Sequence, residues 1–393
     1  MSPPDDLAGR QALVIGASGF IGGRLAERLA LERKARVRVM VRRASSAARI
    51  ARLPVEVVLG DILDRSAVAE AAQGCAVIFN AAKGTGRDAV LRRAVDGDGV
   101  RNVAAAASSA GARVVHLSSL AVYDLPSDGE VAETTPDVSA GDPYADAKLA
   151  GERMALRLGE VYRVPVVVIQ PTVVYGPHAG VHGSDILDEL RTSRMVLVNG
   201  GSGICNAVYV DDVVTALLLA ATNDRAPGER FLVSGPEHPS WREFIGAFER
   251  MLGVNRTVPM SEAEALDLWR RSRRRAWLVP ETLRAVRQNR ELRKRLLATR
   301  EAAAIMRAAG RLFPRAVSAA ERWTESGARA ERQEEPLPLT PIRPWLVAYL
   351  AKRTRVSSEK ARTLLGYRPL FRREDGMGLT EQWARWAGLL GAR

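Results

Sequence analysis

The sequence is poor in the residues that bind metals or form disulfides. Its 393 residues include two cysteines, Cys75 and Cys205, and four histidines. Two cysteines so far apart cannot build a disulfide framework or a cysteine metal site, so a reducing, cytoplasmic location is expected. His178 and His182 are four residues apart, but the neighbouring Pro177 favours a loop over a metal-binding helix face. The sequence therefore predicts no metal site.

Long apolar runs and leader features are also missing. No run approaches the roughly 18 apolar residues of a membrane-spanning helix, and Asp211 and Asp212 divide the longest candidate. The start of the chain holds Asp5 and Asp6 and no apolar core, so no signal peptide is expected. The apolar fraction of 47% and the charged fraction of 26% are ordinary for a soluble globular protein.

Short apolar segments alternate with longer alanine-rich ones through the first 171 residues. Strands are predicted at residues 11–17, 37–41, 55–61, 77–81, 113–118 and 165–170. Helices are predicted at residues 20–31, 66–73, 88–110 and 143–162. The strands are apolar throughout, as expected when helices cover both faces of a sheet. The pattern predicts an α/β fold with a doubly wound, Rossmann-type parallel sheet.

The pattern is less regular after Pro171. A strand pair is predicted at residues 196–198 and 207–210, a further strand at 229–234, and helices at 211–222 and 241–252. Asp212 is expected to cap the helix at 211–222. We expect a dinucleotide-binding domain of residues 1–171, to which 204–235 returns, and a smaller C-terminal substrate lobe of residues 172–203 and 236–393.

A glycine-rich segment follows the first predicted strand and opens the first predicted helix. It reads Gly16-Ala17-Ser18-Gly19-Phe20-Ile21-Gly22. Glycines there allow a tight turn and a close approach of backbone to a pyrophosphate, which the start of the helix then faces. Such a triplet is weak evidence alone, but its place between strand and helix predicts a dinucleotide site. The expected contacts are Gly16, Ser18, Gly19, Phe20, Ile21 and Gly22.

The end of the second predicted strand indicates which dinucleotide binds. An acidic residue there favours NAD, whereas arginine accommodates the 2′-phosphate of NADP. Val41 is followed by Arg42 and Arg43, with Ser45 and Ser46 close by. NADP is therefore favoured over NAD. The alternative is that both arginines are solvated surface charges in an arginine-rich chain.

The third and fourth predicted strands end in further candidate cofactor contacts. Asp61 and Ile62 follow the third strand, where a carboxylate could accept a hydrogen bond from an adenine amino group. Asn80, Ala81 and Ala82 end the fourth strand, where small residues would let a cofactor lie against the backbone. Both segments support a dinucleotide site, and neither is diagnostic alone.

Hydroxyl groups and a tyrosine–lysine pair follow the fifth predicted strand. That strand ends in Ser118 and Ser119, and Tyr144 and Lys148 come later, one turn apart on the same face of a predicted helix. A lysine ammonium beside a phenol stabilises the phenolate, and an oxidised nicotinamide, itself cationic, acts in the same direction. The phenol can then exchange a proton with a substrate oxygen while hydride moves to or from the carbon.

Together these motifs resemble the extended short-chain dehydrogenase/reductases, also called the NAD-dependent epimerase/dehydratase family. That family includes nucleotide-sugar epimerases and dehydratases and 3β-hydroxysteroid dehydrogenase-like enzymes. The similarity runs from GASGFIG through GDILD, NAA, LSSLAVY, YADAK, QPTVVYGP and VYVDD to the tail EKARTLLGYRP.

The resemblance implies a role for each residue of the motifs. It implies that Tyr144 is the acid–base group, that Lys148 binds the nicotinamide ribose and tunes Tyr144, and that Ser119 rather than Ser118 bonds the substrate oxygen. Pro171, Thr172 and Val173 would border the nicotinamide. Relatives often pair through helices equivalent to residues 88–110 and 143–162, which implies a homodimer.

The chain departs from the family pattern in three places. Asp96-Gly97-Asp98-Gly99-Val100 stands where the family usually has asparagine in a pattern like Asn-Val-x-Gly-Thr. Residues 201–206 supply no arginine of the kind that clasps the diphosphate of nucleotide sugars in many relatives, although Arg242 or an arginine of the basic segment could substitute. Leu120 and Ala121 replace the Asp-Glu pair of dehydratases, so redox chemistry or epimerisation is favoured over dehydration.

About half of the net charge of +13 lies in one segment. Residues 260–335 hold 18 Arg and Lys against 11 Asp and Glu. We interpret residues 261–335 as a basic helical insertion in the substrate lobe. The favoured interpretation of this insertion is a solvated helical lid over the lobe. The alternatives are peripheral contact with an anionic membrane, through residues such as Trp269 and Trp277, and binding of an acidic partner. No nucleic-acid motif accompanies the charge, so no nucleic-acid partner is expected.

The sequence thus predicts an NAD(P)-dependent oxidoreductase or epimerase acting at a secondary alcohol or ketone carbon of a small molecule. The substrate is expected to be a sugar nucleotide or a lipid-like alcohol. The rival hypotheses are a non-catalytic dinucleotide-binding regulator and a membrane-recruited scaffold. The complete set of Ser119, Tyr144 and Lys148 argues against the regulator, because a sensor does not need an acid–base pair.

Overall fold

A seven-stranded parallel sheet forms the centre of the protein, in the order β11-β7-β5-β4-β1-β2-β3. The computed structural model describes residues 7–84, 89–138, 142–276 and 337–390. The strands of the sheet are β1 (Gln11–Ile15), β2 (Arg36–Val41), β3 (Val55–Leu59), β4 (Val77–Asn80), β5 (Arg113–Leu117), β7 (Val166–Pro171) and β11 (Arg230–Val233). This sheet confirms the predicted doubly wound, Rossmann-type fold.

The strand order reverses at β1, which pairs with β2 on one side and β4 on the other. In such sheets, ligands bind outside the carboxyl ends of the strands at the point where the order reverses. We call this end of the sheet the carboxyl edge. The segments that follow β1, β2, β4 and β5 all begin there.

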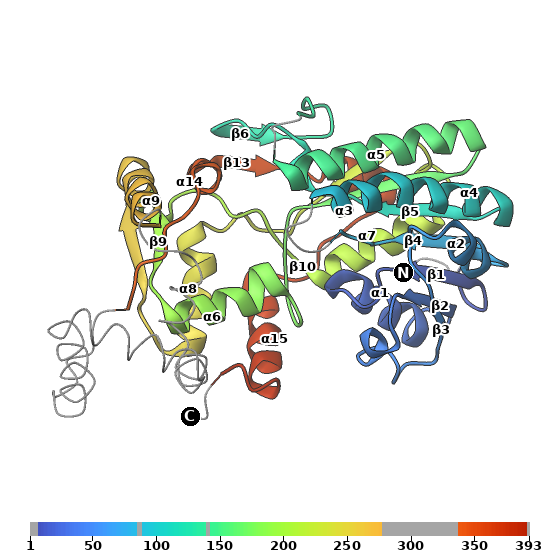
Figure 1. Cartoon of the computed structure of the whole chain (residues 1–393), viewed down its shortest axis with the longest axis horizontal. Coiled ribbons are helices and arrows are strands. Elements are labelled where there is room, and N and C mark those ends of the chain that lie inside the picture. The colour runs from blue at the N-terminus through green and yellow to red at the C-terminus, as the bar shows by residue number, and fades with distance from the viewer. Residues whose placement is uncertain (1–6, 85–88, 139–141, 277–336, 391–393) are drawn as a thin grey trace, which may run out of the picture.

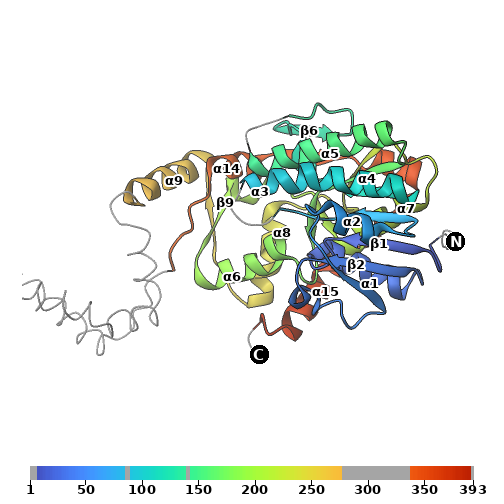
Figure 2. The same ribbon diagram turned by 45° about the vertical axis from the view of Figure 1, so that its right-hand side comes forward.

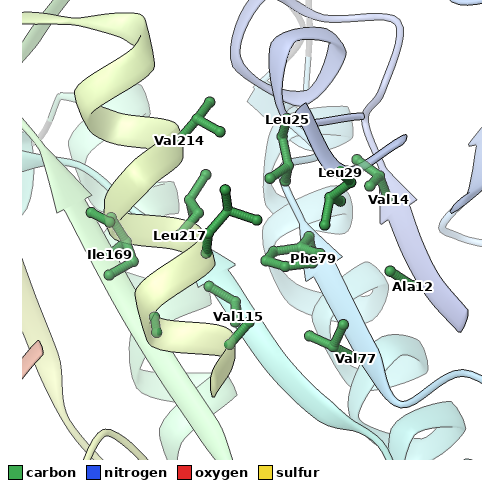
Figure 3. Close-up of a cluster of buried hydrophobic side chains, with 14 of the residues drawn as sticks. Ala12, Val14, Leu25, Leu29, Val77, Phe79, Val115, Ile169, Val214 and Leu217 are labelled. Atoms are coloured by element: carbon green, nitrogen blue, oxygen red, sulfur yellow. The ribbon is translucent and has the colours of Figure 1, made fainter. Parts of the chain in front are cut away.

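Helices cover both faces of the sheet. One face is covered by α1 (Phe20–Leu31) and α7 (Val210–Thr222), and the other by α2 (Arg65–Ala72), α4 (Val100–Ala110) and α5 (Pro143–Tyr162) (Figure 1). Figure 3 shows Leu25 of α1 and Leu217 of α7 facing Phe79 and Val115 of the sheet. Because both faces are covered, β1 is buried along its whole length, which explains why every residue after Gln11 in this strand is apolar.

The helix predicted over residues 88–110 is interrupted. It consists of α3 (Ala89–Ala94), the π-helical stretch η2 (Val95–Gly99) and α4. The stretch reads VDGDG, and glycine and aspartate are both unfavourable inside an α-helix. Single turns of π-helix inside α-helices are frequent at functional sites. Here the turn directs the Asp96 side chain inward, where Asp96 is only 3% exposed.

The predicted pairing of residues 196–198 with 207–210 is wrong. Strand β9 (Met195–Val198) pairs with β12 (Thr257–Met260), and β10 (Ala207–Tyr209) pairs with β8 (Val173–Tyr175). The chain between β9 and β10 cannot close a hairpin because it is packed on the C-terminal part of the chain. A Cβ atom on Gly203 would lie 2.0 Å from the Leu350 carbonyl oxygen, and the Ile204 N–H donates to the Lys352 carbonyl.

The remaining elements form a second lobe beside the sheet. They include α6 (Asp185–Thr192), α8 (Trp241–Leu252), α9 (Glu262–Ala276), α14 (Pro344–Ala351) and α15 (Arg373–Trp386). Figures 1 and 2 show α9 and α14 at the end of the molecule farthest from β3. A third pair of strands, β6 (Asp128–Val131) and β13 (Arg353–Val356), joins the C-terminal part of the chain to the segment after β5. Most of the predicted basic insertion lies outside the described residues.

Asp212 does not cap α7, contrary to the sequence prediction. Tyr209 precedes the helix, and no side chain caps its start. The buried Asp212 carboxylate instead accepts hydrogen bonds from the Leu370 and Phe371 N–H groups of the C-terminal part of the chain, at 2.8 and 3.2 Å. Among the described helices, none is both long enough and apolar enough to cross a membrane.

Candidate active site

The turn between β1 and α1 (residues 16–22, the glycine turn) leaves no space for side chains at two of its glycines. Gly16 has φ of +88°, and a Cβ atom there would lie 2.5 Å from the Ala81 carbonyl oxygen. A Cβ atom on Gly22 would lie 2.4 Å from the Gly16 carbonyl oxygen. The turn therefore packs directly on the segment after β4, and Ala81 and Ala82 lie against it. Only glycine fits both positions.

The start of α1 has the properties of a phosphate site. Gly19 precedes the helix without a side-chain cap, and the first turn contains no acidic residue. The first N–H groups of a helix lack partners inside the helix, and the helix dipole is positive at that end. The backbone at Ser18, Phe20 and Ile21 can therefore receive a pyrophosphate. These features fit a bound dinucleotide.

Two exposed arginines follow β2, which is the neighbour of β1 in the sheet. Arg42 and Arg43 precede a short 3-10 turn, η1 (Ala44–Ala47), that contains Ser45 and Ser46. In the part of the chain that the structure describes, neither arginine has an ion-pair partner. Unpaired guanidinium groups beside serine hydroxyls at this position fit a 2′-phosphate.

Hydrogen bonds between side chains and the backbone hold the segments after β3 and β4. The Asp61 carboxylate accepts from the Leu63 N–H at 3.0 Å, and the Ile62 carbonyl accepts from the Asn102 side chain at 2.9 Å. The buried Asn80 side chain accepts from the Ala82 N–H at 3.2 Å. Asn80 thus holds Ala81 and Ala82 in place next to the glycine turn.

The two serines after β5 have different surroundings. Ser118 is buried and donates to the Glu152 carboxylate at 2.6 Å. Glu152 also accepts from Gln170 and Arg230, so Ser118 belongs to a closed network. Ser119 precedes the 3-10 turn η3 (Leu120–Val122), and its Oγ accepts from the Ala121 N–H at 3.2 Å. The Ser119 hydroxyl keeps its own proton to donate, which favours Ser119 as the substrate contact.

Tyr144 is the second residue of α5 and is held there by the helix cap. The Asp142 carboxylate accepts from the Tyr144 and Ala145 N–H groups, both at 2.9 Å, and Pro143 occupies the first helical position. Proline and an aspartate cap are the preferred residues at a helix start. The Tyr144 side chain is half-buried.

Lys148 lies one turn further along α5 and is buried. Its Nζ donates to the Asp96 carboxylate at 3.0 Å and to the Leu117 carbonyl at 3.3 Å. Leu117 ends β5, two residues before Ser119, so the second contact joins α5 to the carboxyl edge. The structure therefore brings the start of α5 and the Ser119 segment to the same end of the sheet. Pro171 is the last residue of β7, and Val173 follows two residues later at the start of β8, so both also lie at the carboxyl edge.

Two charged residues near Tyr144 were not predicted as site residues. Lys83 follows Ala82, and its Nζ lies 5.1 Å from the centre of the Tyr144 ring. Asp96 was noticed only as a departure from the family pattern. The sequence position of Lys83 was an available signal, because Lys83 directly follows the small residues that end the fourth predicted strand. The buried setting of Asp96 depends on the π-helical stretch, which the sequence did not predict.

Burial lowers the pKa of all four histidines. Burial, together with the charge of Lys148, lowers the pKa of His116 to about 3. Burial is also the main reason that the pKa values of His178 and His182 are lowered to about 4. Within the described ranges, no group of three His, Cys, Asp or Glu side chains could hold a metal ion.

A cavity of about 450 Å³ lies away from these residues, at the amino end of β11. Its charged lining is paired: Lys360 with Glu229 at 2.6 Å, and Arg230 with Glu152 at 3.3 Å. Because these charges already have partners, the cavity shows no group that calls for a ligand. The residues around Tyr144 are the better candidate for chemistry.

Comparison with known proteins gives consistent matches. Residues 12–234 match the model of the NAD dependent epimerase/dehydratase family. The chain is 30% identical over 280 residues to a 4-hydroxy-2-methyl-3-oxo-4-farnesyl-3,4-dihydroquinoline-1-oxide ketoreductase of Stigmatella aurantiaca, covering 66% of this chain and 81% of the relative. It is 31% identical over 264 residues to a UDP-glucose 4-epimerase of Mycolicibacterium smegmatis, covering 62% of this chain and 83% of that relative.

A solved structure matches nearly the whole chain. The epimerase Mth375 of Methanothermobacter thermautotrophicus superimposes with a TM-score of 0.70 at 20% identity, covering 98% of this chain and 95% of the other. At that identity, the match shows that the fold is shared.

Proposed function

The chain belongs to the NAD-dependent epimerase/dehydratase family of enzymes, and we propose that it transfers hydride at a secondary alcohol or ketone carbon with Tyr144 as its acid–base group. One observation supports this most. The Lys148 Nζ contacts the Leu117 carbonyl, and this contact brings the start of α5 to the strand end that carries Ser119. The segment that carries Tyr144 and Lys148 thus lies next to the segment that carries Ser119, which supports a joint role for the three side chains.

Each of the three side chains has a distinct task. Tyr144 gives a proton to the substrate oxygen in reduction and takes one in oxidation. Lys148 stabilises the phenolate and can bond a ribose hydroxyl with its remaining N–H. Ser119 donates its hydroxyl proton to the substrate oxygen and orients it. The nicotinamide, when bound, supplies or accepts the hydride. If the enzyme is an epimerase, the same proton and hydride transfers run twice around a transient ketone.

We propose that the cofactor is NADP in preference to NAD. Support comes from the exposed Arg42 and Arg43, which lie beside Ser45 and Ser46 after β2. The other proposed cofactor contacts are Gly16, Ser18, Gly19, Phe20, Ile21 and Gly22 of the glycine turn, with Asp61, Ile62, Asn80, Ala81, Ala82, Tyr144, Lys148, Pro171 and Val173.

For the substrate, we favour a lipid-like ketone or alcohol over a sugar nucleotide. Residues 201–206 contain no arginine, and their backbone is occupied by the C-terminal part of the chain, as the Ile204–Lys352 hydrogen bond shows. The Stigmatella relative is a ketoreductase whose name includes a farnesyl group. A sugar nucleotide is the second candidate, because the Arg242 side chain lies beside Gly200 and could bind a diphosphate.

We propose residues 1–171, with 204–235, as the dinucleotide-binding domain, and residues 172–203 and 236–393 as the substrate lobe. We further propose that the basic insertion at 261–335 touches an anionic membrane surface. In the described part of that segment, α9 exposes Arg270, Arg271 and Arg273. It packs near α14, on which Trp345 is 56% exposed. A homodimer through α4 and α5, located in the cytoplasm, completes the proposal.

The test of the proposed function is a screen with two cofactors. Purified protein is titrated with NADPH and NADH and then assayed against lipid-like ketones and sugar nucleotides. We expect NADPH to bind more tightly and at least one ketone to be reduced. The Tyr144→Phe variant should bind NADPH equally well and lose at least about 100-fold in kcat. Unchanged turnover in this variant would favour a non-catalytic regulator or different chemistry.

A further inference from the structure

The buried pair of Asp96 and Lys148 is the most enclosed ion pair near the proposed site. The Lys148 Nζ lies 3.0 Å from the Asp96 Oδ1, and the two side chains are 5% and 3% exposed. A buried ammonium without a counter-ion is driven toward its neutral form by desolvation. The carboxylate of Asp96 supplies a counter-ion to Lys148 where it is buried.

The backbone is shaped to bring this pair together. Asp96 lies in the π-helical stretch η2, and Lys148 lies on α5 opposite it. Gly151 permits the close approach, since a Cβ atom there would lie 2.9 Å from the Asp96 carbonyl oxygen and 3.2 Å from its Cβ. This contact, and the interrupted helix, place the Asp96 carboxylate at the ammonium rather than at the protein surface.

Lys83 is a second ammonium near Tyr144, with the opposite setting. It is exposed, its Nζ lies 5.1 Å from the centre of the Tyr144 ring, and no ion pair with it is found among the residues that the structure describes. A second observation agrees with this position: the charge of Lys83 contributes, after burial, to the low pKa of His182. The Lys83 ammonium thus contacts the Tyr144 ring and acts electrostatically on His182 in η4 (Gly180–Ser184), where the Asp185 carboxylate acts in the opposite direction.

The other charged or titratable groups around Tyr144 do not add positive charge. Asp142 is engaged by the Tyr144 and Ala145 N–H groups at the start of α5. His116 and His182 are neutral at physiological pH, because their pKa values are lowered to about 3 and about 4. Asp96 is paired with Lys148. In the part of the chain that the structure describes, Lys83 is therefore the exposed cation that contacts the Tyr144 ring.

We propose that Tyr144 works between two ammonium groups: Lys148, which Asp96 holds in place, and Lys83, which stabilises the phenolate from the solvent side. Asp96 is then a positioning residue that acts through Lys148. The inference rests on the proposed acid–base role of Tyr144. It adds two residues of this chain to the groups that control when that phenol loses its proton.

The test is a titration of tyrosine ultraviolet absorbance in the protein without cofactor or substrate. Five of the seven tyrosines are Tyr123, Tyr175, Tyr209, Tyr349 and Tyr367, and burial raises the pKa of each. These five ionise only at high pH. The remaining two are Tyr144 and Tyr162, and subtracting the curve of the Tyr144→Phe variant isolates Tyr144. Its midpoint is the quantity compared among variants.

The Lys83→Met variant tests the exposed ammonium. We expect the Tyr144 midpoint to rise by about half a pH unit to one unit, because one cation close to the phenolate is lost in a partly solvated setting. Lys83→Arg should keep the wild-type midpoint, and Lys34→Met, on an exposed lysine outside the site, should leave it unchanged. An unchanged midpoint in Lys83→Met overturns the proposal. So does a Lys83→Met effect confined to the KM of anionic substrates, which would make Lys83 a substrate contact.

The Asp96→Asn variant tests the buried anchor. The amide keeps the volume and an acceptor oxygen but removes the charge, so Lys148 loses protonation more easily. We expect the Tyr144 midpoint to rise by about one unit, with kcat falling more than KM changes. The same substitution in a Lys148→Met background should add no further rise. A fall in the midpoint, or an equal effect in both backgrounds, contradicts the role of Asp96.

These outcomes separate the inference from the proposed function. The midpoints are measured without turnover, so they decide the role of the two ammonium groups even if no substrate is found. Conversely, if Tyr144→Phe retains full activity, the proposed function fails whatever the titrations show. If Asp96→Asn does not fold, the Lys83 variants still decide the proposal, because Lys83 is at the surface.

Discussion

Two parts of the candidate site lie at the same edge of the sheet but are held by different forces. The glycine turn depends on backbone shape, since a single Cβ atom at Gly16 would overlap the carbonyl of Ala81. The Tyr144 cluster, meaning Tyr144 with Lys83, Asp96 and Lys148, depends on charge. Each part should therefore tolerate a different kind of substitution. The turn should reject any added side chain, and the cluster should accept changes of shape but not of charge.

The largest effect is expected from Gly16→Ala. A positive φ and an overlap with backbone that cannot move aside should lower the free energy of unfolding by about 3–4 kcal/mol. Gly378→Ala is the matched control, because this exposed glycine of α15 has no atom within 4 Å of an added Cβ. It should stabilise the protein by about 0.5–1 kcal/mol. Denaturant unfolding measures both, and equal effects would remove the distinction between the two parts.

The next effect separates the adjacent serines Ser119 and Ser118. Ser119→Ala should lower kcat by about 100-fold, because it removes a donor to the substrate oxygen, and should cost only about 0.5–1 kcal/mol of stability through the lost cap of η3. Ser118→Ala should change kcat little and lower stability more. It leaves the buried Glu152 without its 2.6 Å partner and should cost about 1–3 kcal/mol of stability. Steady-state kinetics and thermal unfolding of both variants check this, and a catalytic loss confined to Ser118→Ala would exchange the two assignments.

A smaller effect is expected from the arginines after β2. Replacing Arg42 or Arg43 by alanine should weaken NADPH binding by about 10-fold to 50-fold, since each removes a charge-assisted hydrogen bond to phosphate. NADH binding should hardly change. Fluorescence titration of both cofactors measures the ratio. If the binding of NADH and that of NADPH weaken by the same factor, the arginines support the structure of the turn and do not recognise the 2′-phosphate.

The smallest effect is a pH dependence of stability that arises from His116, which lies near Lys148 of the Tyr144 cluster. His116 has a pKa lowered to about 3 by burial and by Lys148, whereas in the unfolded chain it titrates near 6.5. Below that pH the unfolded state binds the additional proton, so stability falls as the pH drops. The free energy of unfolding should lose about 1–2 kcal/mol between pH 6.5 and pH 5 from this residue.

The control for that pH dependence is His116→Gln, which keeps a polar side chain near Asn80 but has no titrating group. Its unfolding free energy, measured in denaturant at both pH values, should decline less than that of the wild type. An equal decline in the two proteins would place the acid sensitivity on other groups, such as His178 and His182, whose pKa values are also lowered.

The sequence was sufficient wherever local rules decide the structure. The bounds of α1, α5 and α8 were predicted to the residue, since each starts at a recognisable cap or turn. The α5 helix begins after Asp142 and Pro143, and α8 begins with a capping box of Ser240 and Glu243. The parallel sheet was also predictable, because strands covered on both faces must be apolar throughout.

Features that depend on distant contacts were not predictable. The partners of β9 and β10 are set by packing against residues 350–352, far along the chain. Asp212 binds N–H groups of the C-terminal part of the chain rather than its own helix. The position of Lys83 over the Tyr144 ring joins segments that are about 60 residues apart, and no local pattern encodes such a distance.

The most direct test of the central claim follows deuterium from labelled NADPH into a ketone product. The wild-type protein should transfer deuterium to the new alcohol carbon. The Tyr144→Phe variant should bind NADPH with the wild-type affinity and transfer it at least about 100-fold more slowly. Transfer at the wild-type rate by the variant, or failure of the wild-type protein to bind either pyridine nucleotide, would contradict the account.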